Sequence, residues 1–152
     1  MDWIVTQSVS HDGLKKALGK EEGKIDDSHP LLKSSCSQVE SFMVHVAANA
    51  AKPVIPMDGS HVTTSVISLL PTSRGSVTLS SADPAATPCI DPNYYADRYV
   101  MRTGLKKTME ILLDIKEGRA FIESETTAEG QSILSSQFSD SGLAECIKER
   151  GK

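Results

Sequence analysis

The stretch VESFMVHVA at residues 39–47 decides the fold class, because its side chains alternate in the way that a β-strand requires. One face of such a strand carries Phe42, Val44 and Val46, and the other carries Ser41, Met43 and His45. A helix would instead repeat its apolar positions at a longer spacing. Residues 39–47 are therefore predicted to form a strand.

A second strand is predicted downstream at residues 61–70, which are rich in β-branched side chains. Residues 71–75, PTSRG, have turn chemistry and precede a short extended stretch at 76–79. Together they predict a β-hairpin that joins 61–70 to 76–79. Gly75 is expected at a positive φ in a type I turn that ends in a glycine bulge, and Arg74 is interpreted as a turn residue.

Residues 97–114 form the strongest predicted helix, and Asp97 can cap the free amide groups at its start. Apolar side chains recur along it at helical spacing: Met101, Leu105, Met109 and Leu112. Another face is polar and carries Arg98, Arg102, Lys106 and Glu110. The apolar row is interpreted as a core stripe that covers a sheet, and not as a cofactor-binding surface.

Two shorter helices are predicted on either side. The first covers 11–19, with Asp12 as its cap, Leu14 and Leu18 on one face and Gly19 at its end. The second begins at Asp140 or Ser141, has Leu143 and Ile147 on its inner face, and closes at Gly151. Loops are predicted at 20–33, 47–59, 80–92 and 126–139, with one brief extended piece near Cys89 and Ile90 and a turn that begins at Asp91.

The pattern as a whole predicts one α+β domain spanning residues 1–152, built as an antiparallel β-sheet with helices packed on one face. Apolar residues make up 39% of the chain and aromatic residues only 5%. The core must therefore rest on aliphatic side chains and methionine.

Charge and composition argue against several functions. The formal net charge is −4 and no long basic run occurs, so nucleic acid is not an expected partner. No apolar stretch approaches the ~20 residues that a membrane span needs, and residues 1–4 lack the features of a secretory signal, so we expect no membrane partner and a cytoplasmic location by default. Cys36, Cys89 and Cys146 are widely spaced and odd in number, which indicates free thiols.

Motifs that would reveal a catalytic centre are missing from the sequence. Neither a Gly-x-Gly-x-x-Gly loop after a strand, nor a Walker loop, nor a Gly-x-Ser-x-Gly elbow is present. One weak constellation could form if the two strands pair, because a polar sheet face would then carry His45, His61, Thr63 and Ser65. These four are candidates to face a substrate, and the alternative is an ordinary solvated sheet face. No catalytic, cofactor-binding or metal-binding residue is assigned.

Three ordered motifs carry a family resemblance. They are DGSHVTT at 58–64, LPTSRGSVTLSSADP at 70–84 and IDPNYY at 90–95. The similarity continues through DRYVMR at 97–102 and upstream through DSHPLLK at 27–33. This ordered set resembles the glucose-methanol-choline (GMC) oxidoreductases.

The resemblance implies that the chain is part of the substrate-binding domain that lies over a bound FAD. In the family, hydride passes from an alcohol to the flavin while a histidine accepts the hydroxyl proton. The sequence contains neither the family's dinucleotide-binding glycines nor its His-Pro-Ala-Gly-Thr motif. We therefore expect a fragment of an FAD-dependent oxidoreductase that acts on CH-OH groups, inactive alone and binding no FAD alone.

A second hypothesis assigns the chain to a different class. It is a non-enzymatic interaction module that reuses the sheet to hold a partner chain or a small apolar molecule. A sheet separated from neighbouring domains exposes apolar surface and strand edges, so self-association through this surface is expected.

Overall fold

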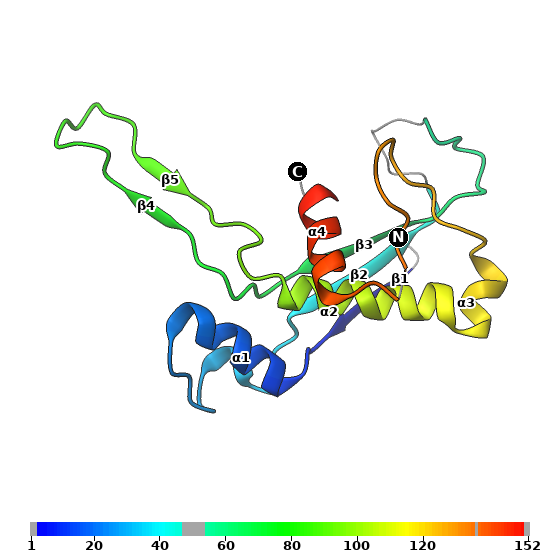
Figure 1. Ribbon diagram of the computed structural model, residues 1–152, viewed down its shortest axis with the longest axis horizontal. Coiled ribbons are helices and arrows are strands. Elements are labelled where there is room, and N and C mark those ends of the chain that lie inside the picture. Colours follow the sequence, from blue (N-terminus) through cyan, green and yellow to red (C-terminus); the bar gives the residue numbers. More distant parts are fainter. Residues whose placement is uncertain (1–2, 47–53, 136, 151–152) are drawn as a thin grey trace.

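The computed structural model, which describes residues 3–46, 54–135 and 137–150, confirms the α+β class. Three antiparallel strands form the main sheet in the order β1-β2-β3: β1 is Trp3–Gln7, β2 is Val39–Val44 and β3 is Thr63–Ser68. A separate two-stranded ribbon pairs β4 (Ser76–Thr78) with β5 (Cys89–Asp91). Figure 1 shows the ribbon projecting from the body of the molecule.

The helices gather on and around one central helix. In chain order they are α1 (His11–Glu22), the 3-10 helix η1 (Pro30–Leu32), α2 (Tyr99–Met109), the π-helix η2 (Glu110–Asp114), α3 (Lys116–Phe121) and α4 (Asp140–Arg150). Helix α2 packs against β2 and β3, while α1 and α4 both contact α2 (Figure 1). The prediction of an antiparallel sheet with helices packed against it is confirmed.

A close approach between α2 and the sheet is made possible by Gly104. A Cβ atom at this position would lie 2.5 Å from Cγ1 of Val39 and 2.9 Å from Cγ1 of Val66. One turn further along, the hydroxyls of Ser41 and Thr108 form a buried hydrogen bond of 3.1 Å. Val39 and Ser41 alternate along β2, and both side chains therefore face α2.

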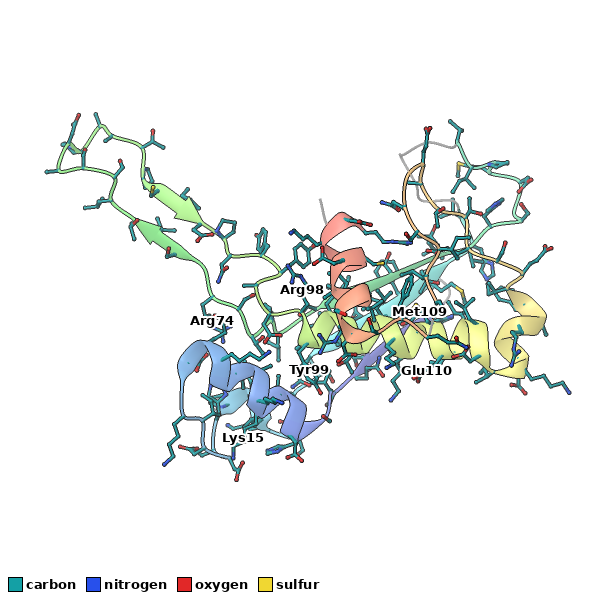
Figure 2. All side chains as sticks on the ribbon, viewed as in Figure 1. Lys15, Arg74, Arg98, Tyr99, Met109 and Glu110 are labelled. Carbon is teal, nitrogen blue, oxygen red and sulfur yellow. The ribbon has the colours of Figure 1, made fainter. Side chains whose placement is uncertain are left out.

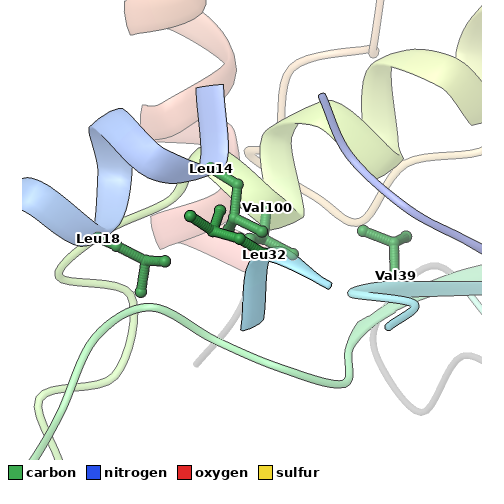
Figure 3. Close-up of a cluster of buried hydrophobic side chains, with 5 residues drawn as sticks. All are labelled: Leu14, Leu18, Leu32, Val39 and Val100. Atoms are coloured by element: carbon green, nitrogen blue, oxygen red, sulfur yellow. The ribbon is translucent and has the colours of Figure 1, made fainter. Parts of the chain in front are cut away.

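The main hydrophobic cluster lies where α1, η1, β2 and the start of α2 meet (Figure 3). Its members are Leu14, Leu18, Leu32, Val39 and Val100. Leu18 is fully buried, so the predicted inner face of the first helix is confirmed. The cluster consists entirely of aliphatic side chains, as the low aromatic content predicts.

A buried glutamine joins the η1 segment to the sheet. Gln38 is 2% exposed, and its side-chain oxygen accepts a hydrogen bond from the backbone amide of Val9. Its side-chain amide donates to the carbonyls of Leu31 and Cys36, both at 3.1 Å. All of these bonds replace contacts with water, which is what allows a polar side chain to be buried here.

The predicted hairpin between residues 61–70 and 76–79 is wrong. Strand β3 pairs with β2, and β4 pairs with β5 instead. Gly75 does not have a positive φ. A glycine is needed at this position because there is no room for a side chain: a Cβ there would lie 2.5 Å from the carbonyl oxygen of Asp91.

Residues 74–93 leave the body as an arm, and polar groups close its base. The guanidinium group of Arg74 donates to the carbonyls of Pro71, Thr72 and Ser73, which turns the chain away from β3. The same guanidinium lies 3.4 Å from Glu22, at the end of α1 (Figure 2). Across the base, Asn93 donates to the carbonyl of Arg74. Arg74 does not lie in the predicted hairpin turn, because that hairpin is not formed.

The short strand near Cys89 and Ile90 and the turn that begins at Asp91 are both confirmed. The Asp91 carboxylate accepts a hydrogen bond from the amide of Asn93, which has a φ of 47°. This contact ends β5 and directs the chain toward α2.

Predicted helix ends are only partly correct. At the start of α1 the capping side chain is Ser10, which accepts from the amide of Gly13, and Asp12 lies inside the first turn. Helix α1 runs past Gly19 and ends before Gly23, whose φ is 85°, so the predicted loop over 20–33 begins too early.

The other two helices begin close to their predicted caps. Asp97 does accept from the amide of Tyr99 at the start of α2. At α4, the side chain of Ser139 accepts from the amide of Gly142, and this replaces the predicted Asp140 or Ser141 cap. Leu143 and Ile147 are buried on the inner face, as predicted.

Strand β1 and helix α3 were not predicted. Three consecutive apolar residues open β1, so no alternation marks it, and α3 is only six residues long. The predicted loop over 126–139 has no helix or strand among its described residues. Most of the 47–59 loop and Gly151 lie outside the described residues, and 54–59 contains no regular element.

Candidate substrate hollow

An open hollow of about 1230 Å³ lies beside the sheet. Its walls come from β3, from the second half of α2 together with η2, from the segment 121–134 and from the end of α4. Figure 2 labels Met109, which lies near the end of α2 and belongs to this lining. The hollow therefore combines segments that are far apart in the sequence.

The apolar wall is formed by the row that was predicted as a core stripe. Within that row, Met109 is buried, with 4% of its surface exposed. Met101, Leu105 and Leu112 are half-buried, and all four side chains line the hollow. The row thus covers the sheet where α2 meets β2 and β3, as predicted, and it also lines the hollow beyond the sheet.

All four predicted substrate-facing candidates line the same hollow: His45, His61, Thr63 and Ser65. They do not share one sheet face, however. Ser65 pairs with Phe42 and Thr63 pairs with Val44, whereas His45 lies past the end of β2, which stops at Val44 and is shorter than the predicted strand over 39–47. They meet because the hollow reaches both sides of β3, which is an edge strand of the sheet.

The candidate side chains have defined neighbours. Thr63 donates from its hydroxyl to the carbonyl of Val46 at 2.7 Å. The ring of His45 meets the ring of Phe121 edge-on, with centroids 5.8 Å apart. His61 forms a 2.8 Å hydrogen bond between Nδ1 and the hydroxyl of Ser60.

Asp58 and Ser60 extend this group and were not predicted from the sequence. Both the amide and the hydroxyl of Ser60 donate to Oδ1 of Asp58, at 2.9 and 2.5 Å. These hydrogen bonds, the hydroxyl bond first, lower the pKa of Asp58 because they stabilise its charged form. The signal in the sequence was the Asp-Gly-Ser spacing, in which an aspartate bonds the backbone two residues ahead.

An ion pair ties the far rim of the hollow together. Glu125 and Arg150 are 2.6 Å apart, and both also line the hollow. The second carboxylate oxygen of Glu125 accepts from the amide of Leu134, and Arg150 also donates to the carbonyl of Ser132. The loop before α4 is thereby fastened to the end of that helix.

Neither a metal-binding group nor a membrane helix is found in the described ranges. No three His, Cys, Asp or Glu side chains among residues 3–46, 54–135 and 137–150 are placed to hold a metal ion. In the same ranges, no helix has the length and apolar character that crossing a bilayer requires. Cys36, Cys89 and Cys146 are free thiols, as predicted.

Comparisons with known proteins agree with the resemblance in the motifs. Residues 71–152 match the family model described as GMC oxidoreductase. The chain is also 34% identical over 148 residues to GMC-type oxidoreductase acuG of Aspergillus aculeatus. That match covers 94% of the chain and 28% of the relative, so the chain spans little more than a quarter of the relative's length. No solved structure matches the chain.

The match to the family model covers more than half of the chain, and it defines the class to which the chain belongs. The chain belongs to the GMC oxidoreductase family.

The GMC family is FAD-dependent, so the fit of the described residues to FAD needs examination. A dinucleotide is held by a glycine-rich turn between a parallel strand and a helix N-terminus. Both sheets in the described part of the chain are antiparallel. The described residues therefore do not fit the pyrophosphate group of FAD, and we derive no step through the flavin.

Proposed function

We propose that the chain is part of the substrate-binding domain of an FAD-dependent alcohol oxidoreductase, and that its hollow holds the alcohol. Family membership supports the reaction class, since GMC oxidoreductases share it. The observation that carries the proposal is the hollow itself, which brings the four polar candidates together with an apolar wall.

Such a lining suits an alcohol with an apolar body. Small-molecule sites are mostly apolar, with a few polar groups that fix the orientation of the ligand. Here Met101, Leu105 and Met109 supply the apolar contacts, and the polar edge supplies hydrogen-bonding groups. In this proposal the chain binds and orients the alcohol, and no described residue is assigned to hold the flavin or to accept the hydroxyl proton.

Benzyl alcohol is a suitable probe, because it combines an aromatic body with one hydroxyl group. We expect it to shift the NMR signals of Met101 and Met109 in the purified 152-residue chain. Leu105→Trp should weaken binding at least several-fold, since the larger ring would fill part of the hollow. Lys107→Trp is the matched control, because this side chain is exposed and lies outside the lining.

Two results would contradict the proposal. The first is an absence of shifts in the hollow at alcohol concentrations that saturate small-molecule sites of this kind. The second is stoichiometric uptake of FAD by the same preparation, which would show that these residues hold the cofactor themselves.

A further inference from the structure

The dipeptide Asp-Gly occurs twice in the chain, at Asp12-Gly13 and at Asp58-Gly59. In this dipeptide the backbone can attack the aspartate side chain, because the glycine has no Cβ to shield its amide nitrogen or to restrict its rotation. The attack requires the amide nitrogen of the glycine to reach Cγ of the aspartate. The surroundings of each site therefore decide whether the reaction occurs in the folded chain.

The first site is held by helix α1 and by a neighbouring ring. Gly13 lies in the first turn of α1, and its amide donates to the hydroxyl of Ser10 at 3.3 Å. A Cβ atom at Gly13 would collide with the ring of Tyr99, so the backbone is also packed from outside the helix. A helical backbone keeps its dihedral angles, and the amide nitrogen of Gly13 therefore cannot rotate toward the Asp12 carboxyl.

The second site lies in an exposed bend, outside any helix or strand. Gly59 has a φ of 81°, and a Cβ added to it would meet no atom within 4 Å. The side chain of Asp58 is 58% exposed. The backbone at Gly59 therefore has the space to rotate that the backbone at Gly13 lacks.

Ser60 restrains the carboxyl group at the second site. Its amide and its hydroxyl both donate to Oδ1 of Asp58, and these bonds, the hydroxyl bond first, lower the pKa of Asp58. The imidazole of His61 also faces this carboxylate, with Nδ1 4.0 Å from Oδ1. Only a protonated carboxyl readily loses its hydroxyl group, so the lowered pKa slows the attack at neutral pH without removing it.

We propose that Asp58-Gly59 is a site of spontaneous modification, at which aspartate rearranges to isoaspartate in the folded chain while Asp12-Gly13 stays intact. The amide nitrogen of Gly59 forms a bond to Cγ of Asp58. The Cγ–O bond breaks, and the hydroxyl group leaves with the amide proton as water, which closes a succinimide ring. Water then adds to the main-chain carbonyl carbon of Asp58 and breaks its bond to nitrogen. One water leaves and one enters, so no oxidant or other reactant is needed.

The product changes the rim of the hollow. In isoaspartate the main chain passes through Cβ and Cγ, so it gains a methylene group just before Gly59 and Ser60, which both line the hollow. The side-chain oxygen that accepts the two bonds from Ser60 becomes part of the main chain or moves away with the new carboxylate. This modification needs no ligand and is therefore independent of the proposed function.

The test is to age the purified 152-residue chain at neutral pH, both folded and in urea, and to digest it at intervals. Electron-transfer fragmentation of the peptides distinguishes isoaspartate from aspartate by mass spectrometry, although the whole peptides have equal masses. In the folded chain, isoaspartate should accumulate at least several-fold faster at Asp58 than at Asp12. In urea the two sites should react at similar rates, because the fold no longer separates them.

Three variants separate the chemistry from general damage. Asp58→Glu should abolish the product at this position, because glutamate would have to close a larger ring. Ser60→Ala should speed the reaction at Asp58 several-fold, since the pKa of the carboxyl returns toward its ordinary value. Ser28→Ala is the matched control: it removes the same pair of side chains in a turn, where the hydroxyl of Ser28 donates to Asp26, and it should leave the rate at Asp58 unchanged.

Several results would overturn the proposal. Equal accumulation at Asp12 and Asp58 in the folded chain would show that the fold does not select the second site. Absence of isoaspartate at Asp58 in the folded chain would show that the bend protects it, whether or not the product forms in urea. An unchanged rate in Ser60→Ala would remove Ser60 as the restraint on the reaction.

Discussion

The cluster around α1 and the β4–β5 arm place apolar residues in opposite environments. In the cluster, Leu18 is fully buried and Leu14 nearly so. In the arm, Val77 is 70% exposed and Leu79 is 86% exposed. The hydrophobic effect therefore stabilises the cluster, and it contributes little to the arm in this state.

The arm is held instead by hydrogen bonds and by close backbone packing at its base. A two-stranded ribbon alone is at best marginally stable in water. Arg74, Asn93 and Gly75 provide the contacts that fix where it leaves the body. From this comparison we expect the cluster to dominate the free energy of unfolding of the whole chain, and the arm to open separately.

The largest expected effect on the free energy of unfolding comes from a substitution in the cluster. Leu18→Ala should lower the free energy of unfolding by about 2–5 kcal/mol, because it removes buried methyl groups and leaves a cavity. Urea denaturation followed by circular dichroism measures this value. Leu79→Ala is the matched control in the arm, and it should change the value by less than about 0.5 kcal/mol. Similar losses in the two variants would show that the arm is packed in solution.

A smaller loss of stability is expected from a substitution where α2 meets the sheet. Gly104→Ala should destabilise the chain by about 1–3 kcal/mol through overpacking against Val39 and Val66, partly offset by the better helix propensity of alanine. Gly19→Ala in α1 is the control, since a Cβ there meets no atom within 4 Å. That variant should be more stable than the wild type by about 0.5–1 kcal/mol. Thermal unfolding of both should give shifts of opposite sign, and a shared sign would contradict the close approach at Gly104.

Local sequence patterns predict those elements whose stability is local. The helical spacing of Leu14 and Leu18 and the alternation along β2 are properties of a few neighbouring residues, and both predictions are confirmed. Strand pairing is different, because it depends on which distant segment supplies the partner. The pattern of β3 is compatible with β2 or β4, and only the whole fold selects β2.

The same distinction applies to the hollow. The strand patterns grouped His45, His61 and Thr63 on one predicted sheet face, but in the structure these residues line one hollow at the edge of β3, together with α2 and the 121–134 segment. The row from Met101 to Leu112 has the helical period of a core stripe. Period alone does not show which of these side chains contact the sheet and which extend beyond its edge. The hydrogen bonds from Ser60 to Asp58 depend on a turn geometry that the sequence merely permits.

The smallest effect on global stability is expected at the base of the arm. Gly75→Ala should speed amide hydrogen exchange in β4 and β5, because the added Cβ would press on the carbonyl oxygen of Asp91 and weaken their pairing. The free energy of unfolding measured in urea should stay within about 0.5 kcal/mol of the wild type, since the buried cluster is untouched. Gly19→Ala again serves as the control and should leave exchange in the arm unchanged. If Gly75→Ala instead destabilised the chain as much as Leu18→Ala, the arm and the cluster would have to unfold as one unit.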